Sequence, residues 1–276
     1  MALVDLAANT SGTLHMLRIV RPSINADFVN STNETSYVSG GNTSTWQVGR
    51  IEVIDPDIQC NGTAGRSQLV GCGVSNNIDI SIRGGELAGR TSQVVFASTG
   101  RTPTVRVSGT KISGFNYLIG GSGQSNVYLH GADVASMGSG QTGGIIGTYG
   151  AGSAGTHLTH NVYSGQTKFG ETFVSGQLGA YTDLHFWSSG GNTSTEVTPF
   201  YNNANNDGGA SNNNTYNLHG NCSDWKVNLD KIARSAGAIV QVQTAIGTIL
   251  ANELAVCSTS GAANSWKQLT DTTKVY

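Results

Sequence analysis

The sequence predicts an all-β protein, a single-stranded right-handed parallel β-helix (a solenoid) with small caps at its N- and C-terminal ends. A short pattern of alternating apolar residues that ends in glycine occurs three times, around Ile82, Val107 and Leu129. Alternation of this kind is typical of a strand with one buried face. The copies lie about 25 and 22 residues apart, and a repeat of this length is typical of a solenoid.

Each repeat contains three apolar clusters, of which the first two form a pair of residues five positions apart. The pairs are Val53/Ile58, Ile82/Leu87, Val107/Ile112, Leu129/Val134 and Leu158/Tyr163, and the third clusters are Leu69-Val70, Val94-Val95-Phe96, Leu118-Ile119, Ile145-Ile146 and Phe173-Val174. A glycine within the pair, as at Gly84, Gly109 and Gly131, marks a corner that needs backbone freedom. Each repeat is therefore predicted to form three short strands, two corners and one loop of variable length.

We expect three regions along the 276 residues. Residues 1–50 are predicted to form an N-terminal cap or attachment segment, because a solenoid needs a cover over the strand edges at each open end. Residues 51–200 are predicted to be the parallel β-helix. Residues 201–276 are predicted to contain the last repeats and a C-terminal cap, after an exposed, Asn-rich loop of low complexity at 201–214.

Composition argues against several classes of function. Charged residues make up 12% of the chain, the net charge is −2 and no basic run occurs, so a nucleic-acid partner is not expected. No membrane-spanning apolar run and no signal peptide are visible. We therefore expect that the protein is made in the cytoplasm and does not insert into a membrane. The four cysteines (Cys60, Cys72, Cys222 and Cys257) form no CxxC motif, and the histidines form no HExxH motif. We therefore expect neither a metal site nor a cofactor, and the disulfide state stays open.

Outward-facing residues of successive repeats should stack in columns about 4.8 Å apart. One predicted column contains Ser81, Arg106, Tyr128, His157 and His185, and the next contains Arg83, Ser108, His130, Thr159 and Trp187. Such polar and aromatic side chains can hydrogen-bond sugars and stack on their apolar ring faces. We therefore predict that a carbohydrate binds to Arg106, Tyr128, His130, His157, His185 and Trp187. A solvated sheet face without a ligand is the alternative.

The best candidates for catalytic carboxylates are Glu86 and Asp133. A predicted column just before the second strand contains Asp57, Glu86, Lys111, Asp133 and Val162. Glycoside hydrolases usually place two carboxylates about 5–9.5 Å apart. Glu86 and Asp133 would instead lie two repeats apart, roughly 10 Å, with Lys111 between them. A charge ladder is therefore the first interpretation, and catalysis by Glu86 and Asp133 is the second.

The repeat of short strands with Gly, Ser and Asn corners, loops of variable length and few charges resembles the right-handed β-helix domains of bacteriophage tailspikes and tail fibres. The resemblance is architectural and covers about residues 51–256. It implies a homotrimer on the virion surface, made in the host cytoplasm, that binds a bacterial surface polysaccharide. It also implies that the N-terminal segment contacts other virion proteins.

We therefore expect a structural virion protein, a tail spike or tail fibre, that binds a host-surface glycan. Because a fold does not fix a function, two alternatives stay open. One is a polysaccharide depolymerase, either a glycoside hydrolase or a lyase, whose activity would depend on Glu86 and Asp133. The other is a capsid-decorating protein without a ligand.

Overall fold

The computed structural model shows strands and no helix within the residues that it describes. These residues are 4–6, 12–26, 34–40, 47–60, 66–72, 78–89, 93–97, 99–137, 144–148, 156–169, 181–194, 215–220, 239–241, 254–257 and 266–268. Three sheets of six, eight and seven strands are parallel, and a fourth sheet of three strands is antiparallel. The predicted all-β class with parallel pairing is therefore confirmed for this part of the chain.

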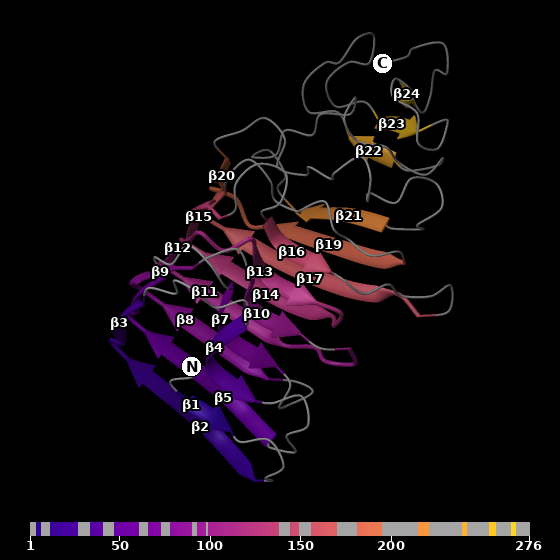
Figure 1. The fold of residues 1–276 in the computed structure, drawn as a ribbon. Helices are drawn as coiled ribbons and strands as arrows, with labels where there is room; N and C mark the ends of the chain where they lie inside the picture. The colour runs from indigo at the N-terminus through magenta and orange to yellow at the C-terminus, as the bar shows by residue number, and fades with distance from the viewer. Residues whose placement is uncertain are drawn as a thin grey trace.

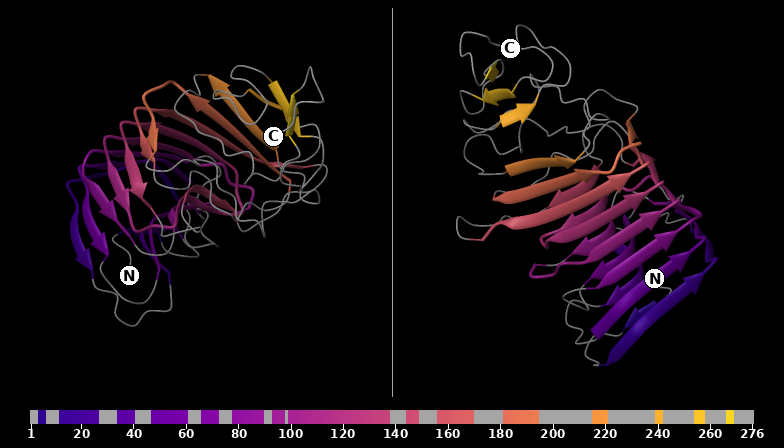
Figure 2. Two further views of the ribbon diagram at one scale, coloured as in Figure 1. Left: turned by 90° about the horizontal axis from the view of Figure 1, so that it is seen from above. Right: turned by 180° about the vertical axis from the view of Figure 1, so that it is seen from behind.

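The eight-stranded sheet is the longest, and its strands lie side by side in chain order (Figures 1 and 2). It contains β2 (Thr13–Val20), β5 (Gln47–Ile54), β8 (Asp79–Arg83), β11 (Thr104–Ser108), β14 (Ser125–His130), β17 (Leu158–Gly165), β19 (Thr182–Ser188) and β21 (Thr215–Gly220). β2 lies at one edge of this sheet and β21 at the other.

The described residues also form two smaller parallel sheets and one antiparallel sheet. The six-stranded sheet contains β1 (Val4–Leu6), β4 (Glu34–Gly40), β7 (Arg66–Cys72), β10 (Gln93–Ala97), β13 (Tyr117–Gly121) and β16 (Gly144–Thr148). The seven-stranded sheet contains β3 (Ser23–Ala26), β6 (Asp57–Cys60), β9 (Glu86–Ala88), β12 (Lys111–Ser113), β15 (Asp133–Ser136), β18 (Lys168–Phe169) and β20 (Thr193–Ser194). The antiparallel sheet contains β22 (Ile239–Gln241), β23 (Leu254–Cys257) and β24 (Trp266–Gln268).

Consecutive strands enter the three parallel sheets in rotation. From β1 to β15, each strand pairs with the strand three places later in the chain. Strands β1–β4, which lie in the segment predicted as an N-terminal cap, already follow this order. Because each sheet receives every third strand, residues one repeat apart in the sequence become direct neighbours across a ladder of backbone hydrogen bonds.

The predicted apolar pairs form rows in one hydrophobic core. Val53, Ile82, Val107 and Leu129 are aligned across β5, β8, β11 and β14, and all four are buried. Their partners Ile58, Leu87, Ile112 and Val134 are buried on the seven-stranded sheet, and Leu69-Val70, Val94-Val95, Leu118-Ile119 and Ile145-Ile146 are buried on the six-stranded sheet. The predicted cluster Phe173-Val174 lies outside the described residues.

The residue directly after β2, β5, β8, β11, β14 and β17 has a left-handed backbone and forms a corner. Gly84, Gly109 and Gly131 have φ values of 65°, 61° and 60° there, which confirms the predicted role of these glycines. Arg21, Asp55 and Gln166 occupy the same corner in other repeats, with φ values of 48°, 47° and 51°. The backbone N–H at each corner donates to a carbonyl of the next repeat, as from Gly84 to Ser108 at 2.9 Å. This shared bond explains why residues with side chains tolerate a conformation that favours glycine.

The predicted pair Leu158/Tyr163 was wrong. Leu129 is aligned with Ser164, and Val134 with Phe169, so Ser164 and Phe169 form the pair in this repeat. Ser164 is buried although it is polar, because its hydroxyl donates to Asn192 Oδ1 at 2.8 Å. Asn192 Nδ2 in turn donates to the Ser188 hydroxyl at 3.0 Å. This polar cluster interrupts the aliphatic row, and the sequence pattern loses its register there.

Three cysteines of the described part of the chain each end a strand. Cys60 ends β6 in the seven-stranded sheet, and Cys72 ends β7 in the six-stranded sheet. Cys257 ends β23, and Cys222 lies outside the described residues.

Candidate ligand-binding groove

An aromatic ladder crosses the outer face of the eight-stranded sheet. Arg106, Tyr128, Tyr163 and Trp187 are aligned on β11, β14, β17 and β19. The Tyr128 and Tyr163 rings are stacked with centroids 4.7 Å apart, and the Tyr163 and Trp187 rings with centroids 4.5 Å apart. The guanidinium carbon of Arg106 lies 4.5 Å from the centroid of the Tyr128 ring. The four side chains therefore form one continuous stack along the sheet.

The stack determines which parts of the rings a ligand can reach. Arg106 covers one face of Tyr128, and Tyr163 covers the other. Tyr163 is itself enclosed between Tyr128 and Trp187, and burial raises the pKa of its hydroxyl. Neither face of the Tyr128 ring is therefore open to stack on a sugar. A ligand beside the ladder would meet ring edges and hydroxyl groups instead.

A shallow groove of about 480 Å³ runs along one side of the ladder. Tyr128, Tyr163 and Trp187 line it together with residues of the neighbouring outward column, namely Arg83, Ser108, His130 and Gly165, and with Ser189. The lining comes from five successive strands, β8, β11, β14, β17 and β19. At a strand spacing of about 4.8 Å, the groove is roughly 19 Å long. Its shape is that of a site for an extended, linear ligand.

Gly165 makes room for the side chain of Ser189 in the lining of the groove. A Cβ atom at this position would lie 2.2 Å from the Ser189 hydroxyl oxygen, so the Ser189 side chain occupies the space that a larger residue would need. The Ser189 hydroxyl donates to the Ser164 carbonyl at 3.2 Å, which holds it over the glycine. The column that begins with Arg83, Ser108 and His130 therefore has no side chain at its fourth position.

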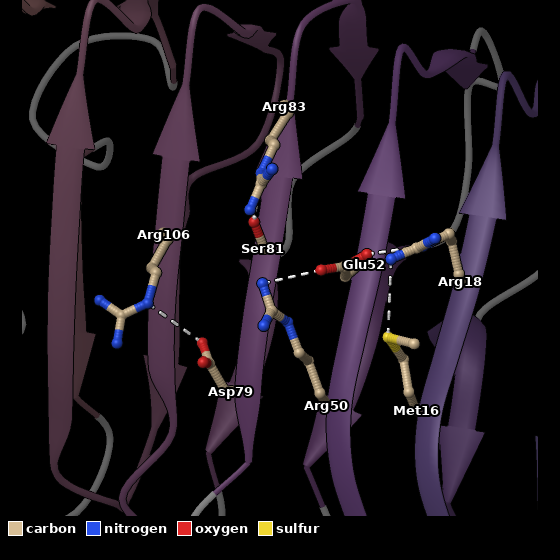
Figure 3. Close-up of polar contacts among 8 residues, drawn as sticks. All are labelled: Met16, Arg18, Arg50, Glu52, Asp79, Ser81, Arg83 and Arg106. Atoms are coloured by element: carbon tan, nitrogen blue, oxygen red, sulfur yellow. Dashed lines mark hydrogen bonds and ion pairs between the residues drawn. The ribbon is translucent and has the colours of Figure 1, made fainter.

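Ion pairs continue the outward columns toward the first strands (Figure 3). Arg18 Nε donates to Glu52 Oε2 at 2.7 Å, and Arg50 Nη2 lies 2.7 Å from Glu52 Oε1. The hydrogen bond from Arg18 lowers the pKa of Glu52 and outweighs burial, which acts in the opposite direction. Arg106 Nε lies 3.3 Å from Asp79 Oδ1. Each carboxylate oxygen of Glu52 therefore lies beside an arginine, and the Asp79 carboxylate pairs with Arg106.

The register differs from the prediction for two histidines and one tryptophan. The column that begins with Ser81 continues through Arg106 and Tyr128 to Tyr163 and Trp187, where His157 and His185 were expected. His157 precedes β17, and its Nδ1 lies 2.9 Å from Asp183 Oδ1. His185 lies in the adjacent column, aligned with Asn161 and Asn126. The groove thus includes four of the six predicted ligand-binding residues: Arg106, Tyr128, His130 and Trp187.

Tyr163 is the central residue of the ladder that sequence reasoning missed. It was assigned to the core because it follows Leu158 by five positions, whereas the structure places it outward between Tyr128 and Trp187. The alternation of Thr159, Asn161 and Tyr163 with the buried residues His160, Val162 and Ser164 was the available signal. It was weak because two of the three buried residues are polar.

Glu86 and Asp133 lie on the seven-stranded sheet, away from the residues that line the groove. They are two strands apart with Lys111 aligned between them. Lys111 Nζ lies 2.9 Å from Glu86 Oε1, and Lys168 Nζ lies 3.4 Å from Asp133 Oδ2. The bond to Glu86 raises the pKa of Lys111. The column has Lys168 at its fifth position, where Val162 was expected. It begins with two neighbouring negative residues, Asp57 and Glu86, and its charges alternate from Glu86 to Lys168.

No protein-family model, curated protein or solved structure matches this chain. The described residues contain no group of three or more His, Cys, Asp or Glu side chains that could hold a metal ion. They also contain no helix of the length and apolarity needed to cross a membrane.

Proposed function

We propose that this chain is a structural virion protein of a bacteriophage, a tail spike or tail fibre, that binds a host-surface glycan in the groove beside the aromatic ladder. The observation that carries the proposal is the groove itself. It is long and open, and it is lined by hydroxyl groups, ring edges, arginines and a histidine. These groups suit a ligand that is rich in hydroxyls and extended along one direction.

The proposal includes a finer description of the fold. The rotation of strands among three parallel sheets is what a right-handed parallel β-helix would give, with one strand of each sheet in every turn. Such a stack offers a long, flat side wall, and the eight-stranded sheet is that wall. In the same proposal the protein is a homotrimer on the virion surface, and residues 1–50 attach it to other virion proteins.

A binding role is favoured over hydrolysis by the positions of the carboxylates. The described residues that line the groove include no Asp or Glu. The two candidate carboxylates, Glu86 and Asp133, lie on the seven-stranded sheet, where each pairs with a lysine of that sheet. Hydrolysis of a glycoside by the usual route needs two carboxylates that flank one bond. The groove as described supplies neither.

The proposal is tested by binding the purified chain to an array of bacterial capsular and lipopolysaccharide glycans. We expect binding to at least one polymer and its loss in Trp187→Ala, which removes one end of the ladder. Ser108→Trp tests the site without disturbing the ladder, because a large side chain there would fill the groove. Phe96→Ala is the matched control, since Phe96 is a half-buried aromatic residue on the six-stranded sheet.

Two results would overturn the proposal. The first is that the folded chain binds no surface glycan on the array and adsorbs to no bacterial cell. The second is that Ser108→Trp and Trp187→Ala both keep full affinity while their circular dichroism and melting temperature match those of the unmodified chain. A native mass measurement checks the trimer separately, and a stable monomer would contradict that part alone.

A further inference from the structure

The charges beside the groove are not balanced. On the outer face of β2, β5, β8 and β11, four positive side chains face two negative ones (Figure 3): Arg18, Arg50, Arg83 and Arg106 against Glu52 and Asp79. This face therefore carries a net charge of +2, although the whole chain carries −2. The excess positive charge lies at one end of the groove, where Arg83 and Arg106 line it.

Arg83 is the cation that the protein leaves available. Its Nε donates to the Ser81 hydroxyl at 3.1 Å, which fixes the direction of the guanidinium group. No ion pair of Arg83 with a carboxylate occurs within the described residues. Glu52, whose pKa Arg83 helps to lower, is already bonded to Arg18 and Arg50. Arg83 is also exposed. An exposed, oriented guanidinium group without a carboxylate partner suits a bidentate anion.

Arg106 and His130 lie beside Arg83 in the lining of the groove. Arg106 uses Nε toward Asp79, while its guanidinium plane covers Tyr128. His130 is exposed and lies in the same column as Arg83 and Ser108. From the described residues, the lining thus has two arginines and a histidine and no acid to oppose an anion.

We infer that the groove selects an anionic polysaccharide, whose carboxylate or phosphate group binds at Arg83 and whose chain runs past His130 toward Trp187. This inference rests on the proposed glycan-binding function and names its ligand class. A single-stranded nucleic acid is also a linear polyanion, but it is disfavoured here because such strands bind through base stacking on open aromatic faces. The faces of Tyr128 and Tyr163 are covered by one another and by their neighbours.

The test is a calorimetric titration of the full chain with four probes at low and high salt. The probes are polygalacturonate, the same polymer after reduction of its carboxyl groups, a phosphorylated mannan and an oligo-dT strand. We expect polygalacturonate or the phosphorylated mannan to bind at least tenfold more tightly than the reduced, neutral polymer. The affinity of the anionic polymer should fall as salt is raised. Comparing polygalacturonate with the phosphorylated mannan tells a carboxylate ligand from a phosphate ligand.

Arg83→Gln should weaken binding of the anionic polymer by about tenfold or more, because it removes a charged hydrogen bond. Binding of the neutral polymer should not change. Arg21→Gln is the matched control. It removes the same charge from an exposed arginine that does not line the groove, at a corner position that a glutamine, Gln166, already occupies in another repeat. We expect less than a twofold change in that variant.

The possible failures are distinguishable. If surface glycans bind and Ser108→Trp blocks them, but neutral polymers bind as tightly as anionic ones, the inference is overturned and the proposed function stands. The same holds if Arg83→Gln has no more effect than Arg21→Gln. Tighter binding of oligo-dT than of both anionic glycans would overturn the inference in favour of a nucleic-acid site. Absence of binding to every glycan would overturn both.

Discussion

Tyr128 and Tyr163 lie face to face on the neighbouring strands β14 and β17, with their ring centroids 4.7 Å apart and their planes inclined by 6°. They are 35 positions apart in the sequence, and the parallel register brings them together. The same register adds Trp187 on the far side of Tyr163, 4.5 Å away and inclined by 10°. The parallel register between neighbouring strands therefore places all three rings along one wall of the groove.

Tyr163 should contribute more to stability than either of its neighbours in the ladder. It makes two ring contacts, and a stacked aromatic pair contributes about 0.5–1.5 kcal/mol beyond its buried area. We expect Tyr163→Ala to lower the free energy of unfolding in urea by about 2–3 kcal/mol, and Tyr128→Ala to lower it by less. Equal losses in the two variants would show that the stack does not act as a unit.

The corner position offers a matched pair of substitutions with opposite signs. Gly131→Ala should cost about 1–2 kcal/mol, because the residue must keep φ near 60° and nothing else lies within 4 Å of the new methyl group. Gln166→Gly should stabilise the protein by up to about 1 kcal/mol, because it relieves the same conformation. Ser136→Ala, at an exposed strand end, is the control and should change stability by less than about 0.5 kcal/mol. A loss of stability in Gln166→Gly would contradict the assignment of strain to this corner.

His160 should make the fold sensitive to mild acid. It is fully buried, its Nδ1 lies 2.9 Å from the Ser125 hydroxyl, and its Nε2 has no hydrogen-bond partner among the described residues. Burial lowers the pKa of His160 to about 4, while in the unfolded chain it is about 6.5. The unfolded state therefore binds the proton first as the pH falls. Stability should decrease from about pH 6.5 down to pH 4, by roughly 3 kcal/mol in total.

The double variant Ser125→Ala/His160→Leu should remove this pH dependence. The next residue in the same interior row is Leu184, which is buried, so the row already accepts a leucine. We expect the variant to be as stable as the unmodified chain at pH 7 and more stable at pH 5. Chemical unfolding between pH 4 and pH 7 measures both quantities. An unchanged slope of stability against pH would mean that another group titrates.

Glu86 and Asp133 should prove to be surface charges rather than catalytic groups. We expect Glu86→Gln and Asp133→Asn to leave glycan binding unchanged, and any release of oligosaccharide from a bound polymer to continue at the same rate. Glu86→Gln should also bring the pKa of Lys111 down toward its ordinary value, because the hydrogen bond from Lys111 to the carboxylate raises it. An NMR titration of the lysine side chains measures that shift. Loss of cleavage in either variant would restore the depolymerase alternative.

The sequence was sufficient to predict the parts of the fold that rest on apolar alternation. Each of these repeats has the same apolar alternation, and this makes two features predictable. They are the row through Val53, Ile82, Val107 and Leu129 and the corners at Gly84, Gly109 and Gly131. The prediction lost its register at Ser164, where an interior position is polar. Its hydrogen bond to Asn192 spans 28 positions, and no local pattern announces such a partner.

That shift of register also explains what was missed at the candidate site. An interior Leu158 places His157 in the outward column and Tyr163 in the core. The local alternation around Val162 indicates that Tyr163 faces outward, but this pattern is hard to recognise because the buried residues His160 and Ser164 are polar. Columns within the first repeats, which contain Arg106, Tyr128 and His130, were predicted correctly because their interior neighbours are aliphatic.

Fluorine NMR of the chain labelled with 5-fluorotryptophan tests the location of the glycan site most directly. The protein has four tryptophans, Trp46, Trp187, Trp225 and Trp266, and the resonance of Trp187 is assigned by its loss in Trp187→Phe. We predict that a bound surface glycan shifts the Trp187 resonance and that Ser108→Trp prevents this shift. A glycan that binds with full affinity, leaves Trp187 unchanged and shifts another tryptophan would contradict this prediction.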